Sequence, residues 1–244
     1  MRSISAMPSV PRSAATAILG ELRRVGRAER RKVAEWYCSS KMRTFGVATP
    51  DLRRVTRAWS RRLRGASGQE VLRLARGLVA ARVTDARNAA YEILSRHAPA
   101  MAALNAAALT ALGSGNDNWG SVDAFSVLVA GVVWRQGQID DNVVLCWACS
   151  QDRWWRRTAL VSTVPLNQRS RGGTGDVTRT LAICALLVDD RDDMVVKGLS
   201  WALRALAVPK PAVVRAFLAR HRDRLARRVL REVGNKLRTG RKNP

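Results

Sequence analysis

Apolar residues recur at intervals of three and four along nearly the whole chain, and no stretch alternates apolar and polar positions with a period of two. The first spacing places apolar side chains on one face of a helix, whereas the second would indicate a strand. Clusters of polar, glycine and proline residues divide the chain into roughly a dozen helices of ordinary length. The sequence therefore predicts an all-α protein, with breaks at residues 46–50, 65–68, 113–118, 165–175 and 208–211.

Four of the predicted helices begin alike, which indicates an internal repeat. Each starts at an aspartate, a residue that often caps helix N-termini, and continues with apolar or aromatic residues. When Asn88, Asp123, Arg157 and Lys197 are taken as equivalent, successive copies are 35, 34 and 40 residues apart, and Arg228 follows 31 residues later. The four aspartates are Asp85, Asp117, Asp152 and Asp193.

A period in this range, with two helices in each unit, is typical of helical solenoids. We therefore expect a right-handed α-solenoid of HEAT-like repeats, whose concave inner face carries the five equivalent residues as one polar row. The alternative is a chance alignment of helices rich in alanine, leucine and arginine. Agreement of the aspartates and of the equivalent positions over several copies favours the repeat.

Length and composition suggest one folded body. We expect a single HEAT-like-repeat domain over residues 13–238, preceded by a flexible N-terminus at 1–12 and followed by a basic tail at 239–244. No apolar run approaches the roughly 20 residues that span a membrane. No secretory signal is visible either, so a cytoplasmic protein without a membrane contact is expected.

The charge of the chain is strongly unbalanced. It has 43 Lys and Arg against 19 Asp and Glu, a formal charge of +24 and a pI of about 11.6. Such an excess is typical of proteins that bind polyanions, nucleic acids above all. Arginine-rich codon usage explains why arginine outnumbers lysine, but not why acidic residues are few. The arginine-dense stretch at 220–242 and a basic, glycine-rich segment at 165–175, expected to be a mobile loop, are candidate phosphate contacts.

Residues suited to metal or nucleophilic chemistry are scarce. Cys146 and Cys149 have the spacing of half a zinc site, but no second pair follows at a suitable distance. They lie in an apolar helical stretch and are predicted to be buried, inert thiols. The two histidines, His97 and His221, are far apart and have no triad-like neighbours. We therefore expect neither a metal nor another cofactor.

One carboxylate and two tryptophans stand beside the predicted polar row. Trp119 precedes Asp123 by four residues, and Trp201 follows Lys197 by four. Residues four apart share a helix face, so both rings are expected near the row. A negative charge on such a basic surface suggests a positively charged substrate. The remaining aromatic rings considered are assigned to packing: Trp59, Trp134 and Trp147.

These motifs resemble the DNA alkylation repair enzymes built of HEAT-like repeats, the AlkD-type alkylpurine DNA glycosylases. The resemblance runs in order over most of residues 15–238. Each motif is short, whereas their order and spacing together are more specific. The matching stretches are Tyr37 with residues 45–50, then residues 119–123, 154–157 and 197–204.

The resemblance implies a monomeric enzyme that cradles duplex DNA in its concave cleft and hydrolyses the N-glycosidic bond of purines alkylated at N3 or N7, such as 3-methyladenine and 7-methylguanine. By position, Asp123 matches the catalytic carboxylate, and Trp119 and Trp201 match the aromatic residues that contact the deoxyribose. The remaining candidates for DNA or substrate binding are Tyr37, Asn88, Arg157, Lys197, Arg204 and Arg228.

The expected chemistry suits these residues. A purine alkylated at N3 or N7 is already positively charged, so it leaves as a neutral base without a general acid. A carboxylate would stabilise the oxocarbenium-like transition state. Lys197 could in principle form a Schiff base, but an ordinary lysine is protonated at neutral pH, which favours a monofunctional glycosylase. Two alternatives stay open: a non-catalytic protein that binds DNA or branched DNA, and a solenoid scaffold for acidic proteins or RNA.

Overall fold

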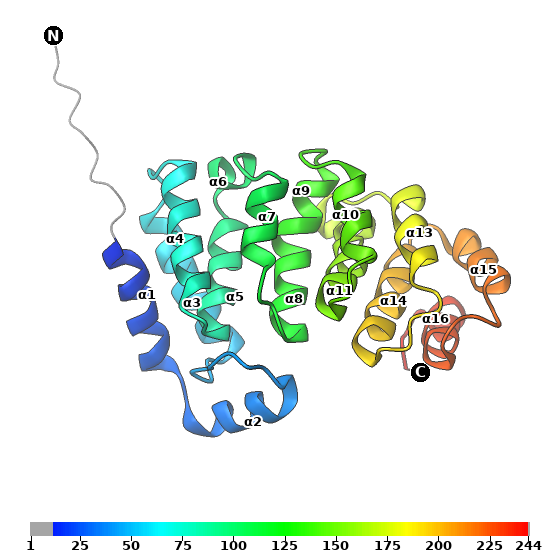
Figure 1. The fold of residues 1–244 in the computed structure, drawn as a ribbon, viewed down its shortest axis with the longest axis horizontal. Coiled ribbons are helices and arrows are strands. Elements are labelled where there is room, and N and C mark those ends of the chain that lie inside the picture. The colour runs from blue at the N-terminus through cyan, green and yellow to red at the C-terminus, as the bar shows by residue number, and fades with distance from the viewer. Residues whose placement is uncertain (1–11, 244) are drawn as a thin grey trace, which may run out of the picture. The chain divides into compact units, whose positions relative to one another are not determined.

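The computed structural model describes residues 12–243, and this part of the chain is helical, with no strand beyond an isolated bridge between Arg43 and Val83 (Figure 1). The all-α prediction is confirmed. The predicted flexible segment 1–12 lies outside the described residues except for Arg12, which begins the first helix. The chain divides into two compact units, the first ending at Leu104 and the second starting at Asn105. The single domain over 13–238 stays a prediction.

The first unit packs around one buried helix pair. α4 and α5 contact each other extensively, α3 packs against α5, and α1 and α6 pack against α4. Leu78, Tyr91 and Leu94 are fully buried in this core. In contrast, α2 buries none of its residues. The bounds are α1 (Arg12–Val25), α2 (Ala28–Cys38), α3 (Thr49–Arg62), α4 (Gly68–Ala80), α5 (Thr84–Leu94) and α6 (Ala98–Ala102).

The Asp85 side chain holds the turn that precedes α3 by hydrogen bonds. It was predicted to cap its own helix, α5, but it does not. Its carboxylate accepts hydrogen bonds from Thr44 Oγ1 at 2.8 Å, from Phe45 N at 2.6 Å and from Val47 N at 3.0 Å. The N-cap of α5 is Val83, which forms no side-chain cap. Gly46 makes the turn possible, because its φ is +73° and a Cβ would lie 2.5 Å from the carbonyl oxygen of Arg27.

Replacing Asp85 by alanine is expected to destabilise the first unit by about 3 kcal/mol, because buried backbone N–H groups left without an acceptor cost about 1–3 kcal/mol each. Denaturant unfolding monitored by circular dichroism would measure the change. Asp51→Ala is the matched control, since Asp51 forms only an exposed pair with Arg54. Equal stability of the two variants would contradict the role given to Asp85.

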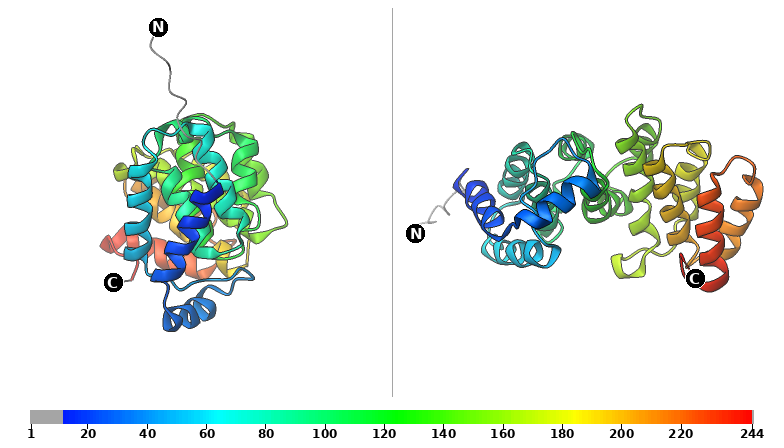
Figure 2. Two further views of the ribbon diagram at one scale, coloured as in Figure 1. Left: turned by 90° about the vertical axis from the view of Figure 1, so that its left-hand side faces the viewer. Right: turned by 90° about the horizontal axis from the view of Figure 1, so that it is seen from below.

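The second unit consists of two layers of helices. α8, α11, α14 and α16 lie side by side in that order, and α10, α13 and α15 cover them (Figure 1, Figure 2). Stacked helix pairs of this kind are the building principle of an α-solenoid. The bounds are α7 (Ala106–Gly113), α8 (Trp119–Phe125), the π-helical η1 (Ser126–Ala130), α9 (Gly131–Arg135), α10 (Asp141–Ala148), α11 (Arg153–Ser162), α12 (Val164–Asn167), the 3-10 turn η2 (Arg169–Arg171), α13 (Val177–Leu186), α14 (Asp193–Leu206), α15 (Pro211–Arg220) and α16 (Arg227–Thr239).

Of the three aspartates predicted to cap helices in this unit, one is the N-cap residue in the structure. Asp152 caps α11 as expected, because its side chain accepts a hydrogen bond from Trp154 N at 2.9 Å. For the other two helices the cap is one residue away from the aspartate that was predicted. Asn118 caps α8, in place of Asp117, and Asp192 caps α14, in place of Asp193. Asparagine and aspartate side chains cap equally well, so composition alone does not decide between neighbours.

The glycine-rich segment at 165–175, expected to be a mobile loop, is a compact turn with short helical segments. It contains α12 and η2, and its glycines return the backbone onto these turns through hydrogen bonds from Gly173 N to Gln168 O at 2.9 Å and from Gly175 N to Leu166 O at 3.1 Å. A Cβ on Gly173 would lie 2.3 Å from the carbonyl oxygen of Pro165. The close approach of two backbone stretches thus explains a glycine here.

The predicted packing roles are partly correct. Trp134 and Trp147 are buried, whereas Trp59 is only half-buried. Cys146 and Cys149 are exposed, so the prediction of buried thiols is wrong. The reason is register: residues three apart share a helix face, and the core-facing positions of α10 are taken by other residues, including Trp147. Among residues 12–243, no helix is long and apolar enough to cross a membrane, and no cluster of potential metal ligands occurs.

Candidate nucleic-acid interface and active site

An ion pair between two neighbouring helices forms the centre of the candidate site. Asp123 on α8 accepts two parallel hydrogen bonds from Arg157 on α11, at 2.9 Å from Nε and 2.8 Å from Nη2. The third nitrogen of Arg157, Nη1, donates to the carbonyl oxygen of Met194. The Arg157 side chain is 6% exposed and the Asp123 side chain 16%, so a small part of the acid stays accessible to solvent. Arg157 thus fixes the orientation of Asp123 without covering it completely.

The electrostatic state of Asp123 reflects two opposing influences. Burial raises the pKa of the Asp123 carboxyl above its ordinary value, while the hydrogen bonds and positive charge of Arg157 oppose that rise. The net direction is upward. Burial removes hydration that would stabilise the anion, so a positive charge brought next to Asp123 would interact with it through a lower dielectric than that of water.

The two candidate tryptophans lie on either side of this ion pair along the helices. Trp119 is the first residue of α8, one turn before Asp123, and is half-buried. Trp201 is half-buried on α14 and packs against a small apolar cluster. That cluster includes Val127 and Val161, each one turn after a member of the ion pair. Both side chains are therefore partly accessible to solvent.

The rest of the predicted polar row is only partly brought together. Lys197 and Arg228 both pair with Asp193, at 2.7 Å and 3.5 Å. Lys197 and the nearby arginines lower the pKa of Asp193. The second unit thus holds four of the five row residues in two ion-pair groups. Asn88 belongs to the first unit, where its side chain is half-buried in α5.

Tyr37, also in the first unit, stands on a helix that has little contact with the core. It is 63% exposed, and the neighbouring Trp36 is 82% exposed. Their ring centroids are 6.4 Å apart, and the two rings are stacked. Trp36 was not singled out from the sequence, although its place beside Tyr37 could have drawn attention to it. The pair presents an aromatic surface in the last turn of α2, after the basic residues Arg30, Arg31 and Lys32.

Comparison with known proteins places the whole helical region in one family. A family model described as DNA alkylation repair enzyme matches residues 18–237. The chain belongs to the DNA alkylation repair enzyme family. Its function is accordingly the repair of alkylated DNA, and DNA is its partner. A comparison with curated proteins gave no match.

Arg204 was predicted to bind DNA or substrate, but the side chains that surround it in this repair protein were missed from the sequence. Arg204 on α14 donates from Nε to Ser200 Oγ at 3.2 Å, and Ser200 in turn donates to Glu232 on α16 at 2.6 Å. Lys242 reaches the other oxygen of Glu232 at 3.4 Å, which ties the basic tail back onto α16. The four-residue spacing of Ser200 and Arg204 could have predicted their contact from the sequence. The contact with Glu232 on α16 could not be predicted, because it depends on how α14 and α16 pack.

Proposed function

We propose that this protein is a monofunctional DNA glycosylase that hydrolyses the N-glycosidic bond of cationic N3- and N7-alkylated purines in duplex DNA. The observation that carries the proposal is the partly exposed carboxylate of Asp123, oriented by two hydrogen bonds from Arg157. A lone oriented carboxylate near two accessible indole rings suits a substrate whose leaving group is already activated. Family membership supports alkylated DNA as the substrate.

The reaction needs no acid to protonate the base. The bond between the sugar C1′ and purine N9 breaks, and its electron pair neutralises the positive charge of the alkylated ring. A water molecule adds to C1′ of the oxocarbenium-like sugar and loses its proton to solvent, which leaves an abasic site. Asp123 acts in this scheme by stabilising the positive sugar, which would approach the accessible part of its side chain.

Trp119 and Trp201 are proposed to contact the deoxyribose. Each side chain is partly accessible to solvent, and a cation over an indole face gains about 0.5–2 kcal/mol. Lys197, Arg204 and Arg228 are proposed to contact phosphates. Lys197 and Arg228 already share the exposed Asp193, so a phosphate would compete with this carboxylate for them.

Tyr37 and Asn88 are proposed as DNA contacts made by the first unit. Tyr37 can stack on a base or sugar, because most of its ring is accessible. Asn88 is half-buried, and its Oδ1 is buried without a hydrogen-bond partner among the described residues, so a contact with DNA would be made by the accessible part of the residue.

The proposed mechanism is tested by comparing release of a cationic base with release of a neutral one. Duplexes carrying either 7-methylguanine or hypoxanthine present the same type of bond, but only the first base is cationic. We expect the protein to release 7-methylguanine well above the spontaneous rate and to release hypoxanthine at least about tenfold more slowly, a difference of about 1.4 kcal/mol. Chromatography of free bases measures both. Equal release would refute charge selection, and tight salt-sensitive binding without release would identify a non-catalytic DNA-binding protein.

A further inference from the structure

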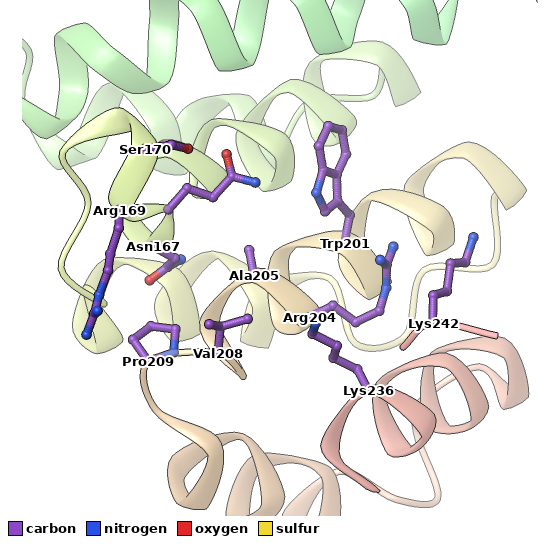
Figure 3. A pocket seen from close by; sticks show the side chains of 11 residues that line it. Asn167, Arg169, Ser170, Trp201, Arg204, Ala205, Val208, Pro209, Lys236 and Lys242 are labelled. Atoms are coloured by element: carbon purple, nitrogen blue, oxygen red, sulfur yellow. The ribbon is translucent and has the colours of Figure 1, made fainter. Parts of the chain in front are cut away.

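A basic cavity opens beside Trp201 in the second unit. It has a volume of about 570 Å³. Figure 3 shows Asn167 and Arg169 on one side, Lys236 and Lys242 on the opposite side, and Trp201 and Arg204 from α14 between them. Three parts of the chain that are distant in sequence therefore meet here: the compact turn at 165–175, α14, and the end of α16 with the basic tail.

The cavity wall carries positive charge and no acid. Four of its lining residues are cations and none is an aspartate or glutamate. Lys236 is satisfied by a neutral group, the carbonyl oxygen of Gly240 at 2.6 Å. Within the described part of the chain, Arg169, Arg204 and Lys236 form no salt bridge, whereas Lys242 pairs with Glu232. Most of the positive charge of the wall is thus uncompensated by the protein.

Arg204 is the most constrained of these cations. Burial lowers the pKa of its guanidinium, and the nearby Glu232 opposes that change. Its Nε is held by Ser200, and among residues 12–243 its two terminal NH₂ groups have no hydrogen-bond partner. A half-buried guanidinium with its fork free is well suited to bind two oxygens of one phosphate. The surrounding lysines would add point charges to the same ligand.

We propose that this cavity is a phosphate-binding subsite for DNA, in which Arg204, Lys236 and Arg169 hold a backbone phosphate near the nucleotide that contacts Trp201. The inference rests on the proposed function insofar as it takes DNA as the ligand. Uncompensated cations select an anion, the arginine fork can bind two oxygens of a phosphate, and the cavity leaves room for the adjoining sugar. A free phosphate compound shares this chemistry and is separated from DNA by the test.

The first test is the salt dependence of binding to undamaged duplex DNA. The double variant Arg169→Gln/Lys236→Gln is expected to reduce the slope of log K against log[salt] by about one for each phosphate that the variant no longer neutralises. Arg73→Gln/Arg76→Gln is the matched control, because it removes the same charge from exposed residues of α4 that do not line the cavity. An equal change in both double variants would overturn the subsite.

The second test uses inorganic pyrophosphate alone. Its stabilising effect on Tm is expected to be smaller in the Arg169→Gln/Lys236→Gln variant than in wild type and control. If that difference is found while the DNA salt slope is unchanged, the ligand is a free phosphate compound and the assignment to DNA is overturned. Base release by the wild type is measured separately. A reduced slope without base release would therefore retain the subsite and refute the glycosylase.

Discussion

Asp123→Asn is expected to slow release of 7-methylguanine by up to about a thousandfold. A carboxylate about 4 Å from the positive sugar gains about 4 kcal/mol at an effective dielectric near 20. The charge of Arg157 is present in both proteins and cancels in the comparison, so the loss of about 4 kcal/mol corresponds to about a thousandfold in rate. Single-turnover base release, corrected for spontaneous depurination, measures the change.

The controls for this prediction separate catalysis from binding and folding. Asp189→Asn removes another carboxylate that pairs with an arginine, but an exposed one, and should leave the rate within about threefold, in line with the small worth of surface pairs. Affinity of Asp123→Asn for undamaged duplex DNA should not fall. An unchanged rate of base release in Asp123→Asn would eliminate Asp123 as the catalytic carboxylate.

The rate of base release is expected to depend on pH through the protonation of Asp123, and Asp123→Asn tests this dependence. Protonation neutralises Asp123 and removes its attraction for the sugar, so wild-type activity should fall as pH decreases through the pKa of this group. Because burial raises that pKa, the fall should occur at higher pH than for an ordinary aspartate. The residual activity of Asp123→Asn should lack this limb of the pH–rate profile.

Arg157→Met is expected to reduce the free energy of unfolding by about 3–5 kcal/mol, because it leaves the largely buried Asp123 without its partner and breaks an ion pair that two helices share. It also removes the donor to the Met194 carbonyl, which links α11 to α14. Urea denaturation followed by circular dichroism measures the change. Base release should also fall, since the carboxylate loses its fixed orientation.

A matched control lies on the same helix. Arg153→Met breaks the pair with Asp192, in which the arginine is 50% exposed, and should cost about 1 kcal/mol or less. When Asp123 is already replaced by asparagine, Arg157→Met should reduce the free energy of unfolding by less. The reason is that most of the effect of Arg157→Met comes from leaving the Asp123 carboxylate without a partner. Similar costs for Arg153→Met and Arg157→Met would contradict the structural role assigned to Arg157.

The sequence repeat predicted which residues are neighbours in the candidate site. Equivalent positions 34 residues apart predicted that Asp123 and Arg157 lie in one row, and they form the central ion pair. Arg157 was expected to support the site and contact the DNA backbone as well. In the structure its guanidinium is engaged by Asp123 and by the Met194 carbonyl, which favours a positioning role. The period of the repeat predicts which residues are neighbours, but not which hydrogen bonds their side chains form.

The sequence by itself determined the helical class, the helix breaks and the basic, polyanion-binding character of the chain, because these depend on local spacing and on summed charge. Only the tertiary structure decided which side chains are accessible. The exposure of Cys146 and Cys149 depends on the rotation of α10 against its neighbours. The cavity beside Trp201 requires α14, α16 and the turn at 165–175 to meet. Both depend on packing between segments distant in sequence, which a local pattern does not contain.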